Sequence, residues 1–150
     1  MAYYKRMKNL ISKLIFPVSF IVSCVGPPDY SDGLLENKPA VINESDYFSL
    51  SLLGDKYTES EEWDLFINSN LTETLLTTLV IKDLNNSSTD STFLLLTNEF
   101  GDTVMNVRIL DELVFSSNDS IIHIGTPSKV VLQGENFTGR IEYQIIINTN

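Results

Sequence analysis

The stretch Arg140-Ile141-Glu142-Tyr143-Gln144-Ile145-Ile146-Ile147 decides the fold class, because apolar and polar side chains alternate along most of it. A side-chain period of two is that of a β-strand, in which successive residues point to opposite faces of a sheet. The stretch therefore predicts a strand with Ile141, Tyr143, Ile145 and Ile147 on its buried face. The same alternation occurs at residues 48–52, 63–67 and 103–109.

Five further segments are rich in leucine and β-branched residues, which favour strands. Turn-forming residues such as Gly54-Asp55 and Gly125-Thr126-Pro127 separate them. No segment has a sustained helical period, although residues 59–63 are compatible with a single helical turn. Short connections join adjacent antiparallel strands, so we expect an all-β domain of sequential hairpins, an antiparallel meander of about nine strands. The five segments are residues 75–83, 91–97, 113–116, 120–124 and 129–133.

The end of the quoted stretch bears on how the sheet closes. Ile145-Ile146-Ile147 is apolar on both faces, and an unpaired edge of that kind would invite aggregation. We therefore expect this strand to be paired on both sides. Pairing on both sides favours a meander that closes as a small barrel, and a β-sandwich is the alternative.

Residues 1–23 have the three parts of a secretory signal. A basic start is followed by an apolar run of nine residues at positions 14–22, and then by the small Ser23. A membrane-spanning helix needs roughly 20 apolar residues, so this run predicts a translocation signal and not an anchor. The end of the signal, Ile21-Val22-Ser23-Cys24, resembles the lipobox of bacterial lipoproteins. The alternative is an ordinary signal that is cleaved nearby.

The lipobox resemblance implies a diacylglycerol thioether on Cys24, cleavage before this residue, and acylation of its new amino group. Two or more acyl chains hold a soluble domain on a membrane almost permanently. The expected partner is therefore the lipid bilayer, through acylated Cys24, and the expected location is the cell envelope, with the outer membrane favoured. Residues 24–45 contain many turn and linker residues and predict a lipidated N-terminus with a flexible tether. The all-β domain is expected at residues 46–150.

The charge of the chain is unevenly divided. The 150 residues carry a formal charge of −10, yet Lys5, Arg6, Lys8 and Lys13 all precede Cys24, and every acidic residue follows it. Without residues 1–23 the chain has six lysines and arginines against 20 acidic residues, a formal charge of −14. Such a surface repels nucleic acid and anionic headgroups, so neither is an expected direct partner. The single cysteine excludes an intramolecular disulfide.

No constellation of residues predicts catalysis, a metal or a cofactor. His123 is the only histidine and has no nucleophile motif near it, so we interpret it as structural. Residues 83–90 place oxygen-bearing side chains as a calcium loop does, but Ser88 stands where such a loop needs glycine and Leu94 where it needs glutamate. We interpret this segment as a hairpin loop. The acidic cluster Glu59, Glu61, Glu62 and Asp64 is interpreted as a solvated turn.

Several landmarks between residues 60 and 147 resemble a family of small Bacteroidota lipoproteins described as lipid-binding and hydrolase-like. The resemblance implies a calycin-like barrel that binds an apolar ligand, and it supplies no recognisable catalytic set. Its landmarks are Glu62-Trp63-Asp64-Leu65, Asp90-Ser91-Thr92-Phe93-Leu94, Asn98-Glu99-Phe100-Gly101, Leu113-Val114-Phe115-Ser116, Lys129-Val130-Val131-Leu132 and Thr138-Gly139-Arg140-Ile141-Glu142-Tyr143.

The leading hypothesis is a non-enzymatic, membrane-tethered barrel whose apolar lumen holds a lipid or another small hydrophobic ligand. The alternative is a β-sandwich that binds protein partners or acts in adhesion, with a filled core and a functional outer surface. A weak hydrolase is the third hypothesis. The residues expected to line the lumen, or else to form an ordinary core, are Trp63, Leu65, Phe93, Leu95, Met105, Val107, Phe115 and Tyr143.

Overall fold

The structure is a computed structural model that describes residues 33–85 and 91–148. The expected signal and the acylated Cys24 lie outside the described residues. The described part of the chain, from Gly33 onward, forms a compact unit with a hydrophobic core.

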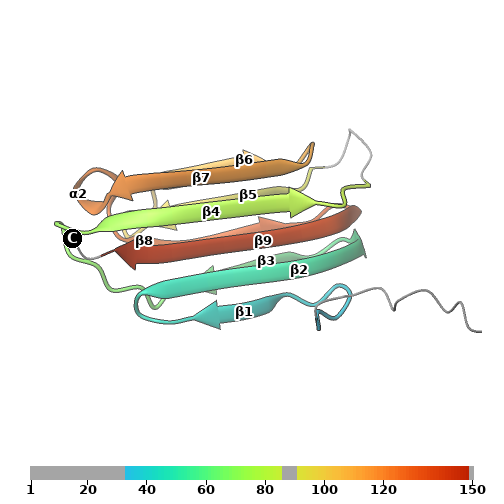
Figure 1. The fold of residues 1–150 in the computed structure, drawn as a ribbon, viewed down its shortest axis with the longest axis horizontal. Helices are drawn as coiled ribbons and strands as arrows, with labels where there is room; N and C mark the ends of the chain where they lie inside the picture. The colour runs from blue at the N-terminus through green and yellow to red at the C-terminus, as the bar shows by residue number, and fades with distance from the viewer. Residues whose placement is uncertain (1–32, 86–90, 149–150) are drawn as a thin grey trace, which may run out of the picture. The chain divides into compact units, whose positions relative to one another are not determined.

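Two antiparallel sheets make up this unit, so the expected all-β class is confirmed (Figure 1). The five-stranded sheet has the order β1-β2-β9-β4-β7, and the four-stranded sheet has the order β3-β8-β5-β6. The large sheet contains β1 (Ala40–Asn43), β2 (Tyr47–Tyr57), β9 (Phe137–Asn148), β4 (Thr74–Lys82) and β7 (Leu113–Ser120). The small sheet contains β3 (Ser60–Asp64), β8 (Pro127–Gln133), β5 (Phe93–Asn98) and β6 (Thr103–Arg108).

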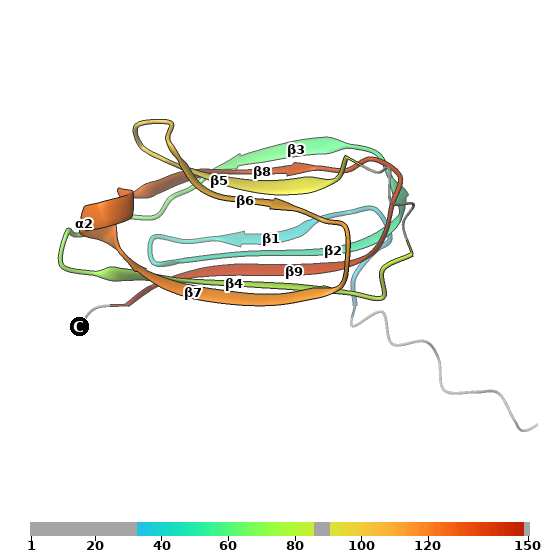
Figure 2. The same ribbon diagram turned by 90° about the horizontal axis from the view of Figure 1, so that it is seen from above.

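The two sheets lie face to face, as Figure 2 shows, and this is the sandwich alternative and not the barrel. In the described residues no strand pairs across from one sheet to the other, so no closed barrel forms. The expected meander is also wrong, because only the β1–β2 and β5–β6 connections join neighbours in a sheet. The other connections join strands of different sheets, and four of them are only two to six residues long. Loop length alone does not distinguish these two cases.

Strand β9 lies in the middle of the large sheet, between β2 and β4. Ile145 pairs with Phe48 on one side and with Thr77 on the other, and Ile146 pairs with Tyr47 and Leu76. The expectation that this two-faced apolar strand is paired on both sides is therefore confirmed. A central position in an open sheet satisfies it without barrel closure.

The alternation of side chains fills the space between the sheets. In β2 and β9 the apolar residues alternate with half-buried or exposed residues, as a period of two requires. The core draws on both sheets, and its fully buried members include Phe48, Leu50, Leu79, Leu94, Leu96, Val130, Leu132, Ile141, Tyr143 and Ile145.

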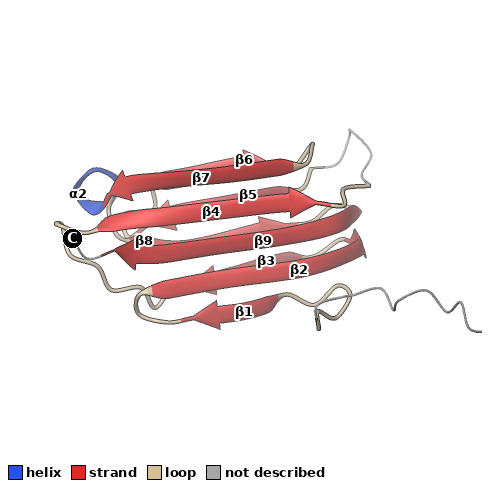
Figure 3. Cartoon of the chain, in the orientation of Figure 1, coloured by secondary structure: helices blue, strands red, loops and turns tan. Residues whose placement is uncertain are grey.

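Three local expectations are corrected (Figure 3). Residues 121–124 form a single helical turn, α2 (Ile121–Ile124), where we expected a strand. The backbone N–H of Gly125 donates to the carbonyl of Ile121 and closes this turn. Residues 60–63, in the segment that was compatible with a single helical turn, belong instead to strand β3, which pairs with β8. The strand expected at residues 63–67 ends at Asp64.

The folded domain begins earlier than the expected boundary at residue 46. Strand β1 pairs with β2 over four residues, from Ala40 with Ser51 to Asn43 with Phe48. Before it, Glu36 forms a bridge with Leu53, and the side chain of Asn37 exchanges two hydrogen bonds of 2.8 Å with the backbone of Asp55. Residues 36–45 thus belong to the sheet and not to a tether.

Candidate functional site

Three aromatic side chains pack together between the two sheets. The ring of Phe48 lies between Trp63 of the small sheet and Tyr143 of the large sheet, and its centroid is 6.3 Å from each of theirs. These tilted and edge-on arrangements are the favourable ones for aromatic pairs. Trp63 and Tyr143 are two of the residues expected to line a lumen, and the structure does bring them to the same ring. They do so as part of a packed core.

The other six candidate lining residues divide into two groups. Leu65, Met105, Val107 and Phe115 are partly buried and pack against the core. Phe93 and Leu95 alternate with the fully buried Leu94 and Leu96, so they lie on the outer face of the small sheet. The structure therefore does not gather the eight residues around a common space. No closed barrel forms from the described residues, and six of the eight side chains belong to the hydrophobic core or pack against it.

Two tyrosine hydroxyl groups are buried without a hydrogen-bond partner in the described part of the chain, those of Tyr57 and Tyr143. Burial raises the pKa of the Tyr143 hydroxyl far above its ordinary value of 10. Burial, together with the carboxylates of Glu61 and Glu59, raises the pKa of Tyr57 to about 12. Both phenols are therefore neutral at physiological pH and cannot act as bases.

The strand register places one set of connections at a common end of the sandwich. Thr74 of β4 pairs with both Asn148 and Ser120, so the start of β4 adjoins the ends of β9 and β7. Figure 2 shows the β5–β6 connection and α2 at this same end. We call this end the loop platform, and it consists of residues 44–46, 65–73, 99–102 and 121–126.

Hydrogen bonds tie these loops together. Asn98, which is almost fully buried, is the centre of the network. Its side-chain oxygen accepts from the backbone N–H groups of Phe100 and Asp102 at 3.0 and 2.9 Å, and its side-chain amide donates to the carbonyl of Ile124 at 2.9 Å. The β5–β6 connection is thereby fixed to α2.

Further bonds extend the network to the β3–β4 connection. The buried carboxylate of Glu73 accepts from the backbone N–H of Asn70 at 2.7 Å, and the carbonyl of Glu73 accepts from the N–H of Ile121. The Ser69 hydroxyl bonds to that of Thr126 at 3.1 Å. The loop platform is therefore a surface held in one arrangement by the fold.

Four large apolar side chains of the loop platform are exposed to solvent. The exposed fractions are 77% for Phe100, 70% for Phe66, 66% for Leu71 and 61% for Ile122. Exposed aromatic side chains are among the residues that contribute most where proteins bind one another, so these four residues are candidates for a contact surface.

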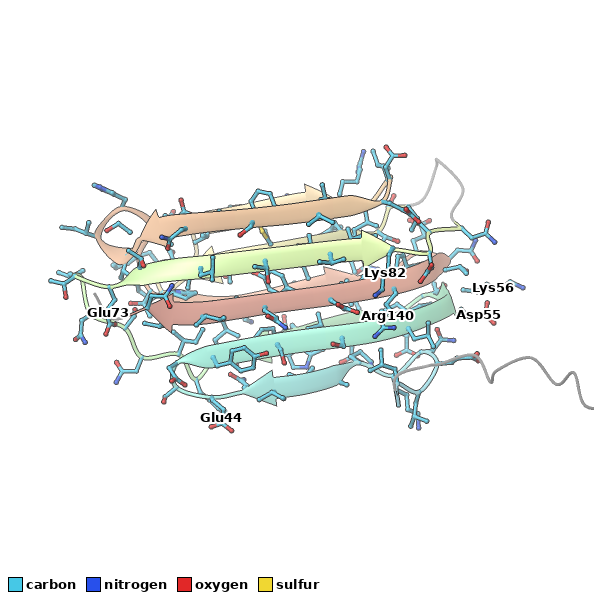
Figure 4. All side chains as sticks on the ribbon, in the orientation of Figure 1. Glu44, Asp55, Lys56, Glu73, Lys82 and Arg140 are labelled. Carbon is cyan, nitrogen blue, oxygen red and sulfur yellow. The ribbon has the colours of Figure 1, made fainter. Side chains whose placement is uncertain are left out.

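The charged side chains of the loop platform are predominantly acidic. Its four segments contain no lysine or arginine, and four exposed carboxylates belong to Glu44, Asp46, Glu99 and Asp102. Figure 4 shows Glu44 and Glu73 at this end, and Asp55, Lys56, Lys82 and Arg140 toward the opposite end. The platform is thus apolar and anionic.

His123, the calcium-like segment and the acidic cluster do not come together as a reactive site in the described residues. His123 is exposed in α2, and the described residues hold no cluster of histidine, cysteine and acidic side chains suited to a metal. Residues 86–90 of the calcium-like segment lie outside the described residues, and the flanking strands β4 and β5 belong to different sheets, so the segment is not a hairpin loop. The acidic residues of β3 form exposed ion pairs, from Lys129 to Glu62 at 3.4 Å and to Asp64 at 3.6 Å.

Comparison with known proteins adds no relative. No protein-family model matches the chain, and no curated protein has a similar sequence. Among residues 33–85 and 91–148, no helix has the length and apolar character that crossing a membrane requires.

Sequence reasoning missed the loop platform, although a signal for it exists. Phe100 and Leu71 stand inside turn-forming sequences, Asn98-Glu99-Phe100-Gly101 and Asn70-Leu71-Thr72. A large apolar residue between turn-forming residues has no strand neighbour to pack against, so it is a candidate for exposure. Alternation identifies core residues, and it is silent about residues in loops.

Proposed function

We propose that this chain is an exported lipoprotein, acylated at Cys24, whose β-sandwich domain binds another protein through the loop platform. It is a non-enzymatic binding module of the cell envelope, and the outer membrane is its proposed location. The observation that carries the proposal is the exposure of Phe66, Leu71, Phe100 and Ile122 on loops that hydrogen bonds hold in place.

The path of the chain supports an orientation in which the loop platform points away from the membrane. Glu36 and Asn37 contact Leu53 and Asp55, near the end of β2 that lies farthest from the loop platform. The segment from Cys24 to Gly33 spans at most about 30 Å when fully extended. A lipid on Cys24 therefore places the domain's opposite end nearest to the bilayer and directs the loop platform away from it.

The chemistry of the platform points to one kind of occupant. Exposed apolar side chains favour a partner with an apolar recess. The carboxylates of Glu44, Asp46, Glu99 and Asp102 favour lysines and arginines at the border of that recess, and they repel an anionic bilayer. We therefore propose a protein with a basic, apolar surface as the partner.

The aromatic contacts between the sheets favour this role over the binding of a small hydrophobic ligand inside the domain. Phe48 contacts both Trp63 and Tyr143 there, so a lipid between the sheets would have to separate side chains that already pack together. Extraction of the purified protein with organic solvent tests this preference. We expect the extract to contain no ligand beyond the acyl groups of Cys24.

Site-specific photo-crosslinking in intact cells tests the proposal. A photoreactive phenylalanine analogue at position 100 is expected to give a protein adduct of defined mass. The matched control is position 114, because Val114 is 81% exposed on edge strand β7, outside the platform. The position-100 adduct should weaken in a Phe66→Ser, Ile122→Ser background, and the captured peptide should contain lysine or arginine beside apolar residues.

Two results would overturn the proposal. Equal adducts from positions 100 and 114 would show that any exposed residue of the domain is captured. Adducts to lipid alone from position 100 would show that the platform faces a membrane.

A further inference from the structure

The outer face of the small sheet carries a second feature, formed by residues of β5 and β6. Phe93 lies opposite Arg108 in the antiparallel register, and Leu95 lies opposite Asn106. Directly opposed side chains of an antiparallel pair lie on the same face, about 5 Å apart at their Cβ atoms. Phe93, Leu95, Asn106 and Arg108 therefore share the surface that points away from the core.

A hollow of about 440 Å³ opens on this face, and it is lined by Phe93, Asn106 and Arg108. The three side chains offer an aromatic ring, an amide and a guanidinium group. Sites for small molecules have this composition, in which apolar surface is combined with a few polar groups that fix the ligand's orientation.

Arg108 is the charged group of the hollow. Lys82, Lys129 and Arg140 are engaged in ion pairs with neighbouring carboxylates, whereas Arg108 has no ion-pair partner in the described part of the chain. Residues 24–150 carry a formal charge of −14, so an exposed guanidinium attracts anions locally while the rest of the surface repels them. A ligand with a single negative charge is therefore favoured over one with several.

We propose that this hollow binds a monocarboxylate carried on a six-membered ring. The guanidinium of Arg108 holds the carboxylate with two parallel hydrogen bonds, since its planar fork matches that geometry. The ring of Phe93 contacts the apolar face of the ligand's ring, and the amide of Asn106 lies beside the ligand and can bond to a polar substituent where the ligand carries one. This site is separate from the loop platform and does not depend on the function proposed for it.

The chemistry fits an acidic sugar or an aromatic acid, and two probes distinguish them. Glucuronate and benzoate are titrated into the chain from residue 24, with Cys24→Ser to prevent lipid attachment, while amide NMR signals are followed. We expect one of the two probes to shift the signals of Phe93, Asn106 and Arg108 in a saturable way. Glucose and benzyl alcohol, which lack the carboxylate, are expected to bind at least about tenfold more weakly.

Variants of two cations on the same sheet face separate recognition from net charge. Arg108→Gln should weaken binding of the active probe about tenfold or more. Lys129→Gln removes the same charge from the neighbouring strand β8, outside the hollow, and should leave affinity within about twofold. Arg108 is exposed, so its replacement is not expected to disturb folding, and the amide spectrum of the variant reports on this directly.

Several outcomes would overturn the proposal. Equal effects of Arg108→Gln and Lys129→Gln would assign the attraction to the general field of the domain. Tighter binding of inorganic phosphate than of either carboxylate would contradict the preference for a single charge. An absence of saturable shifts at Phe93, Asn106 and Arg108 with both probes would leave the hollow without a ligand of this class.

Discussion

The ring of Tyr143 packs edge-on against Phe48 at the centre of the sandwich, with 6.3 Å between the two ring centroids and an interplanar angle of 65°. The contact joins neighbouring strands β9 and β2, and it places the Tyr143 hydroxyl where no described group bonds to it. A buried polar group without a partner is costly, because it loses its hydrogen bonds to water and gains none in return. Position 143 of the core is therefore one at which a less polar residue fits better.

Replacing Tyr143 with phenylalanine is expected to stabilise the domain. Tyr143→Phe keeps the ring contacts and removes the unpartnered hydroxyl, so the free energy of unfolding should rise by about 1 kcal/mol. Denaturant-induced unfolding of wild type and variant measures this difference. Tyr47→Phe is the control, because Tyr47 lies on the outer face and its change should be near zero. A clear loss of stability in Tyr143→Phe would show that the hydroxyl has a partner, such as a buried water.

Alkaline pH is expected to destabilise the fold through Tyr57. Its pKa is about 12 in the folded chain against 10.0 for the free side chain, so the folded state holds the proton more tightly. This contribution to stability is fully present below pH 10 and is lost as the pH rises from 10 toward about 12. Unfolding midpoints measured across that window should fall, and they should fall less steeply in Tyr57→Phe. In Glu61→Gln the loss should also be smaller, since Glu61 helps to raise this pKa. An unchanged slope in Tyr57→Phe would contradict the prediction.

The segment Phe93-Leu94-Leu95-Leu96 shows how far alternation predicts the candidate site. All four residues are apolar, so no polar residue indicates which pair faces the core. The neighbouring strands decide it, because Leu94 and Leu96 pair with Leu132 and Val130 on the buried side. That pairing is a long-range property, and the sequence of β5 does not contain it.

By contrast, alternation correctly predicted the buried face of β2 at residues 48–52 and of β9 at residues 141–145, although Gly54-Asp55 lies inside β2 and not in a turn that ends it. Glu142 and Gln144 interrupt the apolar residues of β9 and identify its outer face. The sequence of β9 does not predict which strands lie beside it, because any strand with one apolar face can pair with it in the sheet. The position of β9 between β2 and β4 is reached only in the assembled sheets.

A methyl group at Gly54 is expected to disrupt the packing of β2 against β9. An added Cβ would lie 2.5 Å from Cδ1 of Phe137 and 2.9 Å from its backbone oxygen. Phe137 is fully buried, so its ring has little room to move. Gly54→Ala should therefore lower the free energy of unfolding by about 1–3 kcal/mol, whereas Ser51→Ala on the outer face of the same strand should change it by less than about 0.5 kcal/mol. Replacing the ring of Phe137 with the smaller leucine side chain should relieve the clash. Gly54→Ala should therefore lower the free energy of unfolding by less in a Phe137→Leu background than in the wild type. Equal costs in both backgrounds would show that the clash is not the cause.

Removing the Asn98 side chain is expected to loosen the loop platform. Asn98→Ala leaves the N–H groups of Phe100 and Asp102 and the carbonyl of Ile124 without their partner, so the domain should lose about 2–3 kcal/mol of stability. Amide hydrogen exchange should accelerate first in residues 99–102 and 121–126. Asn118→Ala, on the exposed face of β7, is the matched control and should have little effect. Uniform acceleration throughout the sheets would indicate that Asn98 stabilises the whole fold and not this end in particular.

Replacing Cys24 with serine is expected to release the protein from the membrane. The lipobox resemblance places acyl chains on this residue, and each buried CH₂ group contributes about 0.8 kcal/mol to membrane binding. Cys24→Ser removes the sulfur that carries the diacylglycerol, so the protein should move from the membrane fraction to the soluble fraction. Ser23→Ala keeps a small residue before the cysteine and should stay with the membrane. The intact mass of the wild-type protein should correspond to a chain that begins at Cys24 and bears acyl groups. A wild-type mass without acyl groups, or a Cys24→Ser variant that remains in the membrane fraction, would contradict the proposed anchoring.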